Sequence, residues 1–331
     1  MDAIASQMKD QRSSAAIGVA VVTYNGAPWI LRCLASLRES AERVAVVVVD
    51  NCSTDNTRDL VSVHYPEVEL LRSERNVGFG VGNNIAIANL LQRDCEMVFL
   101  LNQDAYILPE TLGRLRSFLD EHDEVGVVSP LHCSPDEDQV DMKSFRGYLG
   151  IKAPRFSADA VMGRCHSHYR IPGINAAAWL VRSEVFLRVG GFDPLFFMYG
   201  EDDDLLERMK EHDVHFALLP SSRVVHLRQS PPSQPPRSWL EKVRRRAKLQ
   251  RSILLVQVKR PSYSQLFRVR LLISEGLLRP LASWVVKPDG VELISTIYAA
   301  IQLLGQIEKI RRHADRLNAP GPHFLIEDSR A

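Results

Sequence analysis

Three polar residues, Asn102, Gln103 and Asp104, directly follow an apolar run at 97–101. A short apolar run is typical of a strand buried on both faces of a parallel sheet, and such sheets bind ligands beyond the carboxyl ends of their strands. A carboxylate placed there can hold a hard divalent cation, which can in turn hold phosphates. Asp and Asn also favour turns and helix caps, so this fragment alone leaves both interpretations open.

Two earlier apolar runs, 17–23 and 44–49, end in similar polar clusters. These clusters are Thr23-Tyr24-Asn25 and Asp50-Asn51. A glycine-rich turn, Asn76 to Asn84, lies in the same half of the chain. Because strand ends on one side of a doubly wound sheet share an edge, the three clusters together favour a ligand site over separate turns.

A run of four acids, Glu201 to Asp204, begins a helical pattern that continues to Met209. Carboxylates in the first turn of a helix are favoured by its dipole, but four exceed what that effect needs. Successive helical residues differ in direction by about 100°, so only one or two of the four can face a given site. Trp179, in an apolar run, and His226, after an apolar pair, are weaker candidates because both are more often structural in such places.

Strand and helix patterns alternate through the first 130 residues, which predicts an α/β fold with a parallel sheet. The expected strands are 17–23, 44–49, 68–71, 97–101 and 125–128. The expected helices are 29–40, a short one that follows the turn at 51–57 and ends at about 63, 85–92 and 110–121. Residues 131–170 are polar and irregular, and a further strand is expected at 215–219. The expected divisions of the chain are a disordered N-terminus at 1–14, a domain at 15–230 with halves at 15–130 and 171–230, a Pro-rich linker and helical C-terminal region at 231–318, and a tail at 319–331.

The composition is that of an ordinary globular protein, with 331 residues of which 45% are hydrophobic and 24% are charged. A net charge of +1 gives no basic field that would indicate nucleic acid as a partner. Five scattered cysteines do not form a disulfide framework, and no run reaches the roughly 18 apolar residues of a membrane span. We therefore expect a cytoplasmic protein. Residues 237–251, with seven bases and one acid, or the C-terminal helices offer a peripheral contact with the inner face of the membrane, and an oligomer is also open.

The motifs occur in an order that resembles a known family. They are Val22-Thr-Tyr-Asn25, Asp50-Asn-Cys-Ser53-Thr-Asp55, Asn76-Val-Gly-Phe-Gly-Val-Gly-Asn83, Asn102-Gln-Asp104, Gly190-Gly-Phe-Asp193 and Tyr199-Gly-Glu-Asp202. The ordered set resembles the family 2 inverting glycosyltransferases of the GT-A fold, especially the rhamnosyltransferase-like branch, over about residues 17–230. The resemblance implies a GT-A-type nucleotide-binding sheet flanked by helices, and the helical C-terminal extension lies outside it.

The resemblance also implies how a nucleotide would be held. Asp50 would accept a hydrogen bond from the imide N–H of uracil or thymine, and Ser53 would shape the loop around it. The other residues that would lie by the nucleotide are Thr23, Tyr24, Asn25, Asn76, Gly78, Asn83 and Gln103. Glycines in such a segment let the backbone approach a ligand closely.

The remaining implied roles concern the metal and the reaction. Asp104 would be the last residue of the family's Asp-x-Asp motif, and His226 would complete a site for Mg²⁺ or Mn²⁺. Asn102 takes the first place of that motif, so only one carboxylate remains there. Asp202 would be the general base, supported by Glu201 and Asp203, and Trp179 would contact the sugar or the acceptor.

These roles imply an enzyme that moves a sugar, rhamnose being the first choice, from a dTDP- or UDP-sugar to a hydroxyl of a glycan or lipid-linked acceptor in surface polysaccharide synthesis. One alternative is a Rossmann-type nicotinamide oxidoreductase. The fingerprint of that class is imitated by Gly78-x-Gly80 together with the later Asp104. Against it, Asn83 replaces the third glycine and the glycine-rich segment follows the third strand instead of the first. The other alternative is a non-catalytic module that binds sugar nucleotides, which the reduced metal motif favours.

Overall fold

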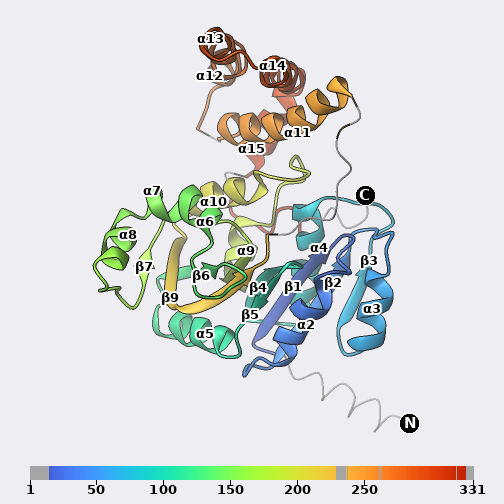
Figure 1. Ribbon diagram of the computed structural model, residues 1–331, viewed down its shortest axis with the longest axis vertical. Helices are drawn as coiled ribbons and strands as arrows, with labels where there is room; N and C mark the ends of the chain where they lie inside the picture. The colour runs from blue at the N-terminus through green and yellow to red at the C-terminus, as the bar shows by residue number, and fades with distance from the viewer. Residues whose placement is uncertain (1–14, 229–235, 237, 261, 318, 326–331) are drawn as a thin grey trace.

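The computed structural model describes residues 15–228, 236, 238–260, 262–317 and 319–325. The N-terminus expected to be disordered, most of the Pro-rich linker and the last six residues of the tail lie outside the described residues. The described chain forms an α/β domain built on one sheet, with a layer of C-terminal helices beyond it (Figure 1).

One half of the sheet is parallel, as the alternation of patterns predicts. It contains, in the spatial order β3-β2-β1-β4, the strands β1 (Ile17–Thr23), β2 (Val44–Asp50), β3 (Glu69–Arg72) and β4 (Met97–Asn102). Thr23 lies opposite Asp50, and Val22 lies opposite Asn102 in the register of the strands. The three polar clusters that follow these strands therefore start from one edge of the sheet.

The other half of the sheet is mixed, so the parallel arrangement predicted for the first 130 residues does not extend to the strand expected at 125–128. It consists of β5 (Ala105–Ile107), β6 (Val125–Cys133), β7 (Tyr169–Arg170), β8 (Ala178–Arg182) and β9 (His215–His226). β8 lies antiparallel between β4 and β6, so the expected fifth parallel strand is not a neighbour of the fourth. β9 runs parallel to β6 and antiparallel to β5 and β7, and it continues past the expected end at 219 with an irregularity in its pairing.

Helices cover both faces of the sheet. They are α2 (Ile30–Arg38), α3 (Thr57–His64), α4 (Phe79–Leu91), α5 (Thr111–Glu121), α9 (Ser183–Val189) and α10 (Glu201–Glu211). Alternate residues of each buried strand enter two separate apolar clusters, because side chains along a strand point to opposite faces. Val98 and Leu100 pack in the cluster of α4 and α10, whereas Phe99 and Leu101 pack in that of α2 and α5.

Two segments are more regular than the sequence predicts. The glycine-rich segment is the first turn of α4, which begins at Phe79, six residues before its expected start. The segment 131–170 contains the end of β6, the helices α6 (Met142–Ser144), α7 (Gly150–Lys152) and α8 (Pro154–Val161), and the π-helical turn η1 (Phe145–Leu149). Leu149 and Phe156 from this segment are buried in the core.

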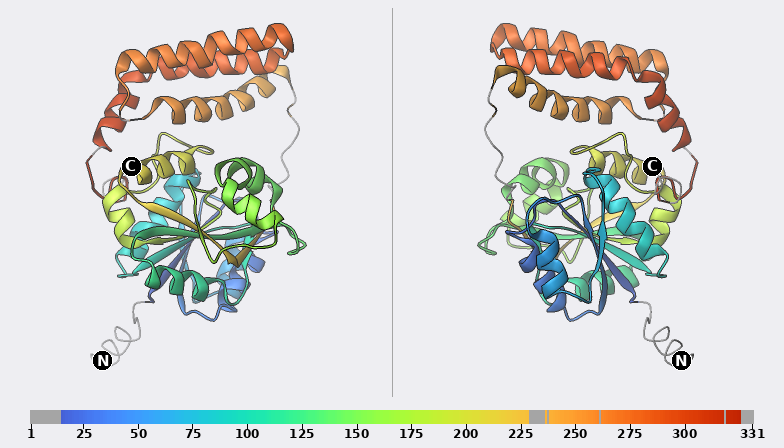
Figure 2. Two further views of the ribbon diagram at one scale, coloured as in Figure 1. Left: turned by 90° about the vertical axis from the view of Figure 1, so that its left-hand side faces the viewer. Right: turned by 90° about the vertical axis from the view of Figure 1, so that its right-hand side faces the viewer.

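The C-terminal region forms a layer of helices on the side of the domain where α10 lies (Figure 2). Its elements are α11 (Trp239–Val258), α12 (Gln265–Ile273), the π-helical turn η2 (Ser274–Leu278), α13 (Arg279–Val286), α14 (Gly290–Leu304) and α15 (Ile307–Arg316). Leu195 and Phe196 of the domain pack in one cluster with Leu254 and Leu303 of the layer. Among the described helices, none has by itself the length and hydropathy of a membrane span, and α14 and α15, bent by 66°, reach them only as a pair.

Residues 319–325, which we expected to be part of a tail, pack on the domain. The Gly191 N–H donates to the carbonyl of His323 over 2.9 Å, and the Gly321 N–H donates to the carbonyl of Arg188 over 2.8 Å. Phe324 and Leu325 are buried. The chain therefore returns from the helical layer to the end of α9.

Candidate active site

Side-chain hydrogen bonds join the ends of β1 and β4. Thr23 Oγ1 donates to Gln103 Oε1 over 2.6 Å, and the Tyr24 N–H donates to the same oxygen over 3.1 Å. Thr23 is buried, whereas the Tyr24 side chain is 38% exposed. Gln103 therefore holds the turn after β1 in place, and the side chain of Tyr24 in this turn is exposed.

A second set of bonds joins the turn after β1 to the loop after β2. The Asn25 N–H donates to Ser53 Oγ over 2.9 Å, and Asn25 Oδ1 accepts from the Thr54 N–H over 2.8 Å. Asp50 is buried at the end of β2, where its carboxylate accepts from the Ser53 N–H at 3.3 Å and lies 3.7 Å from Arg58 Nε. The Ser53 N–H and the Arg58 guanidinium thus stabilise the Asp50 carboxylate at the end of the strand.

Asn51, which follows Asp50 in the second polar cluster, connects this loop to the glycine-rich segment. Its amide donates to the carbonyl of Gly78 over 3.0 Å, and its Oδ1 accepts from the Val77 N–H over 2.8 Å. Asn76 completes the turn by accepting from the Gly78 N–H over 3.0 Å. The position of Asn51 directly after Asp50, at the end of the same strand, marked it as part of that cluster, and the role as a connector comes from the structure.

The glycines bring this segment against the residues before α10. Gly78 has φ +89°, and a Cβ added there would lie 2.2 Å from the carbonyl oxygen of Phe197. A Cβ at Gly80 would lie 2.8 Å from Phe192 Cβ and 3.6 Å from Glu201 Cβ. Only residues without a side chain allow this approach, so the glycines place the acidic start of α10 beside the expected nucleotide segment.

Asp104 and His226 meet where β5 pairs with β9. The register sets Ala105 opposite His226, and the Leu227 N–H donates to the carbonyl of Asp104 over 2.9 Å. Asp104 Oδ1 lies 3.3 Å from His226 Nε2, and the side chains are 13% and 5% exposed. Two ligands that each lie about 2.1 Å from one ion at right angles would be roughly 3 Å apart, so the pair fits adjacent positions around Mg²⁺ or a similar ion.

A second histidine lies beside this pair. His132, Asp141 and His226 each offer a ligand atom within 4.8 Å of the others, and all three are buried. The Asp141 carboxylate already accepts from Arg228 Nε at 2.8 Å and from Ser144 Oγ at 2.8 Å. Burial and the neighbouring His226 and Arg228 lower the pKa of His132 to about 3, so this imidazole is neutral at neutral pH. The cluster therefore presents nitrogen and carboxylate donors, but the Asp141 carboxylate is already paired with a cation.

Asp202 is connected to the end of β4 through the backbone before β8. Asp202 Oδ2 accepts a hydrogen bond from the Ala176 N–H over 3.4 Å. The carbonyl of the following residue, Ala177, accepts from the Asn102 N–H over 3.0 Å. Asn102 stands two residues before Asp104. The structure thus brings Asp202 to the strand end that also carries the Asp104–His226 pair, although these residues are far apart in the chain.

The acids at the start of α10 are not equivalent. Burial, with Asp203 as the next cause, raises the pKa of Asp202 to about 6. Burial and the charge of Asp202 raise the pKa of Glu201 to about 8, so Glu201 is mostly a neutral acid at pH 7. Asp203 accepts from the Tyr148 hydroxyl over 3.4 Å. Asp202 is therefore the acid of this pair that ionises at the lower pH.

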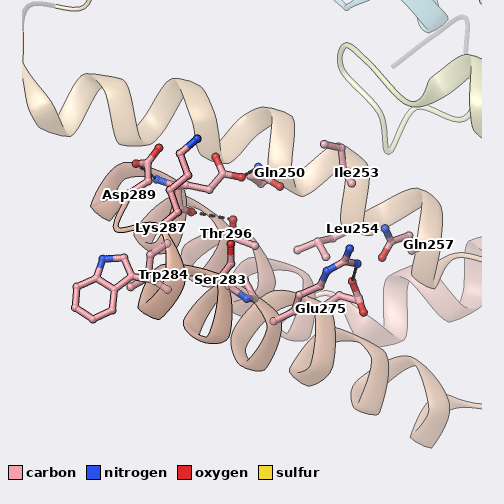
Figure 3. Close-up of a pocket in the computed structure, with 14 residues that line it drawn as sticks. Gln250, Ile253, Leu254, Gln257, Glu275, Ser283, Trp284, Lys287, Asp289 and Thr296 are labelled. Atoms are coloured by element: carbon pink, nitrogen blue, oxygen red, sulfur yellow. Dashed lines mark hydrogen bonds and ion pairs between the residues drawn. The ribbon is translucent and has the colours of Figure 1, made fainter. Parts of the chain in front are cut away.

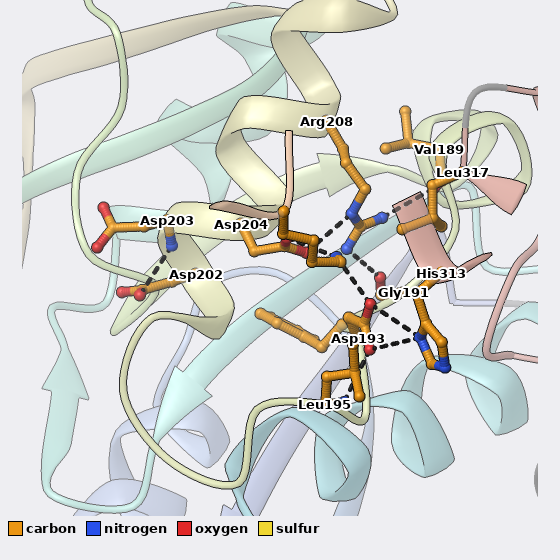
Figure 4. A network of polar contacts seen from close by, with 12 residues as sticks. Val189, Gly191, Asp193, Leu195, Asp202, Asp203, Asp204, Arg208, His313 and Leu317 are labelled. Carbon is orange, nitrogen blue, oxygen red and sulfur yellow. Dashed lines mark hydrogen bonds and ion pairs between the residues drawn. The ribbon is translucent and has the colours of Figure 1, made fainter. Parts of the chain in front are cut away.

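Asp204 points away from Asp202 into a buried network shown in Figure 4. Arg208 donates to Asp204 over 3.0 Å and to the carbonyls of Val189 and Gly191 over 2.9 and 2.6 Å. His313 of α15 lies 3.3 Å from Asp193, so the helical layer takes part in the network. These contacts hold α10 in place on the side opposite to Asp202.

The side chains of two expected site residues are buried within their own elements. Trp179 is fully buried in β8 and packs edge-on against Phe216 at 5.3 Å between ring centres, so it offers no surface to a sugar. Asn83 is buried inside α4, and its amide donates to the carbonyl of Phe79 over 3.0 Å. Both were chosen by residue type and motif position, which do not reveal the face on which a side chain lies.

Comparison with known proteins agrees with this arrangement. Residues 18–177 match the model of glycosyl transferase family 2, and residues 157–230 match that of the N-terminal domain of galactosyltransferase. N-acetylglucosaminyl-diphospho-decaprenol L-rhamnosyltransferase of Mycobacterium tuberculosis is 30% identical over 243 residues, which cover 67% of this chain and 79% of that protein. The chain belongs to glycosyltransferase family 2. Rhamnosyltransferase WbbL of Escherichia coli is 25% identical, with 63% of this chain and 82% of that protein covered.

Solved structures of this glycosyltransferase fold confirm the predicted α/β GT-A architecture. TarS residues 1–349 of Staphylococcus aureus, in complex with UDP-GlcNAc, align with a TM-score of 0.55 at 18% identity and cover 91% of this chain and 89% of that chain. GalNAc-T7 with UDP, GalNAc and Mn²⁺ aligns with a TM-score of 0.58 at 13% identity, and the alignment covers 96% of this chain and 57% of that chain. Membership of glycosyltransferase family 2 makes the protein an enzyme of the sugar-transferring class, so the nicotinamide oxidoreductase alternative is wrong.

Proposed function

We propose that this glycosyltransferase moves rhamnose from dTDP-rhamnose to a hydroxyl of a lipid-linked glycan in the synthesis of a surface polysaccharide. The observation that carries the proposal is the connection of Asp202, through Ala176, Ala177 and Asn102, to the strand end that bears Asp104 and His226. The choice of sugar and acceptor is supported by the names of the mycobacterial and E. coli relatives.

The residues at the sheet edge suit a thymine or uracil nucleotide. Asp50 is a carboxylate, which accepts the imide N–H of these bases and offers nothing to the same ring nitrogen of cytosine. Asn25, Ser53 and Asn51 hold its loop against the glycine-rich segment. Tyr24 is the exposed ring beside it and can pack against the base.

Asp104 and His226 would hold the cation, since an oxygen and a nitrogen ligand at 3.3 Å suit one ion. When bound there, Mn²⁺ or Mg²⁺ supplies positive charge that stabilises the departing diphosphate. The neutral His132 is within reach of the same cluster and adds no positive charge that would oppose a cation.

Asp202 carries out the proton transfer. Its carboxylate takes the proton of the acceptor hydroxyl as that oxygen forms a bond to the anomeric carbon. The bond from this carbon to the diphosphate breaks, and the electron pair leaves with dTDP. Because one displacement occurs, the anomeric configuration inverts and no covalent sugar–enzyme intermediate forms. Phe197, Met198 and Tyr199, exposed directly before α10, provide an apolar surface for the acceptor.

A panel of nucleotide sugars tests the proposal. With Mn²⁺ and a prenyl-diphosphate-linked N-acetylglucosamine acceptor, dTDP-rhamnose should release dTDP faster than UDP-GlcNAc, UDP-glucose or GDP-mannose. Asp202→Asn should abolish transfer and keep dTDP binding, and Asp213→Asn, at the far end of α10, is the matched control. Preference for another sugar would reject the rhamnose assignment, and near-normal transfer by Asp202→Asn would reject the base.

A further inference from the structure

The helical layer has an apolar outer stripe that nothing in the described chain covers. Along the continuous helix from α12 through η2 to α13, Ile273, Leu277, Leu281 and Val285 recur every fourth residue, and all are exposed. That spacing places side chains on one face of a helix. On the neighbouring α14, Ile294, Tyr298 and Ile301 are exposed as well. Large apolar side chains gathered in this way mark an interaction surface.

The stripe lies on the outermost helices of the molecule. In both views of Figure 2, α12–α13 and α14 form the layer farthest from the sheet, and α11 lies between them and the domain. The opposite face of α14 is the packed one, since Ser295, Ala299 and Leu303 are buried. A flat surface could therefore touch the stripe without meeting the rest of the protein.

The same region concentrates positive charge. Residues 238–325 contain sixteen lysines and arginines but six aspartates and glutamates, whereas residues 1–237 contain twenty-four of the former and thirty-two of the latter. The net charge of the whole chain, +1, hides this separation. A basic surface attracts anionic lipid headgroups, and the acidic domain is repelled by them, so the charges also set the orientation.

A groove lies beside the stripe, and charged and apolar side chains both line it (Figure 3). It has a volume of about 280 Å³ between α11, α13 and α14, and Trp284 lines it together with two bases, Arg279 and Lys287, and three acids, Glu275, Asp289 and Glu292. Trp284 is 42% exposed, and tryptophan favours the boundary between headgroups and acyl chains. The Lys287 side chain is exposed next to it.

We propose that the outer face of α12–α14 binds the surface of an anionic phospholipid bilayer. Two copies of the helical layer, residues 238–325, would each bring sixteen bases against six acids, most of the excess on α11 and α15, which disfavours a dimer through the layer. An anionic bilayer matches both this charge and the apolar stripe. This inference does not depend on the proposed sugar donor.

The helical layer contacts the segment next to the candidate site, so binding of the layer to a bilayer would place the site near the membrane surface. Arg251 of α11 donates to the carbonyl of Leu195 over 3.1 Å, and Ser252 Oγ donates to that of Met198 over 3.2 Å. The layer therefore rests on the segment that leads into α10 and carries the exposed Phe197, Met198 and Tyr199. If the acceptor is lipid-linked, as the proposed function has it, the bilayer would deliver it on this side.

Sedimentation of the full chain with vesicles tests the inference. The protein should pellet with vesicles of phosphatidylcholine and phosphatidylglycerol, bind pure phosphatidylcholine weakly, and dissociate in part at high salt. Val285→Asp with Val286→Asp should lower the partition coefficient at least about tenfold, because two exposed apolar side chains that would enter the bilayer become charged. Lys287→Glu should weaken binding to the anionic vesicles alone.

The control is Val63→Asp, which places the same change on an equally exposed valine of α3, on the sheet domain. It should bind vesicles as the unchanged protein does. Release of dTDP to water without acceptor should stay the same in the Val285/Val286 variant, which separates this test from that of the donor. Equal binding by that variant would overturn the inference. The inference would also be overturned if the unchanged protein does not bind vesicles and forms a dimer that the Val285/Val286 variant abolishes.

Discussion

Lys259 Nζ lies 2.7 Å from Asp193 Oδ2, and the side chains are 3% and 0% exposed. The same ammonium contacts Asp204 at 2.5 Å, and Asp204 belongs to α10, the helix that begins with Glu201 and Asp202. The C-terminal region, which the family model does not cover, thus supplies the cation that neutralises two buried carboxylates behind the candidate site. Burial alone would favour the protonated acids, but Lys259 and His313 keep the pKa of Asp193 below its ordinary value.

We predict that Lys259→Met destabilises the protein by about 3 kcal/mol or more, because it leaves two buried carboxylates without their shared cation. Transfer should slow as well, since α10 loses its anchor, and kcat should fall more than the affinity for dTDP. Denaturant unfolding and kinetics measure the two effects. Lys309→Met, which changes an exposed lysine of α15, should alter neither. An unchanged unfolding midpoint in Lys259→Met would contradict the role of the ion pair.

The pKa of Asp202, raised to about 6 by burial and by Asp203, predicts the pH dependence of the reaction. Only the ionised carboxylate can take a proton, so kcat should fall about tenfold per pH unit below 6 and level off above it. Asp203→Asn removes the largest neighbouring charge that raises this pKa, so the midpoint of the profile should move to lower pH. A profile that falls with rising pH, or one that Asp203→Asn leaves in place, would show that another group titrates.

The pair Asp104–His226 predicts a metal-dependent affinity. Asp104→Ala and His226→Ala should each weaken dTDP binding in Mn²⁺ by at least about tenfold, because each removes a ligand, and should leave binding in EDTA nearly unchanged. Calorimetric titration with dTDP in Mn²⁺ and in EDTA provides both values. His64→Ala, an exposed histidine at the end of α3, serves as the control. Equal losses with and without the metal would indicate a direct contact with the nucleotide instead.

The parts of the site that could be predicted are those whose signal is local. An apolar run followed by Asp50 or by Asn102 to Asp104 identifies both a strand and its polar end, and parallel pairing then brings the ends together. The antiparallel insertion of β8 between β4 and β6 depends on contacts between distant segments, which no local pattern encodes. Lys259 is one base at the end of a basic helix, so its type and neighbours give no sign that it is buried.

The last prediction concerns Gly78, where the glycine-rich segment meets the residues before α10. A Cβ at this position would meet the Phe197 carbonyl oxygen at 2.2 Å, and its φ of +89° is unfavourable for any residue with a side chain. We therefore expect Gly78→Ala to destabilise the protein by about 1–3 kcal/mol and to reduce transfer. Gly147→Ala is the control, because a Cβ there has no neighbour within 4 Å. Because backbone strain and the clash would both push 192–199 away from the nucleotide segment, the loss should appear in kcat as well as in stability. A variant with normal kcat and stability would show that the two segments can move apart without cost, and the coupling of the nucleotide segment to Asp202 would then be wrong.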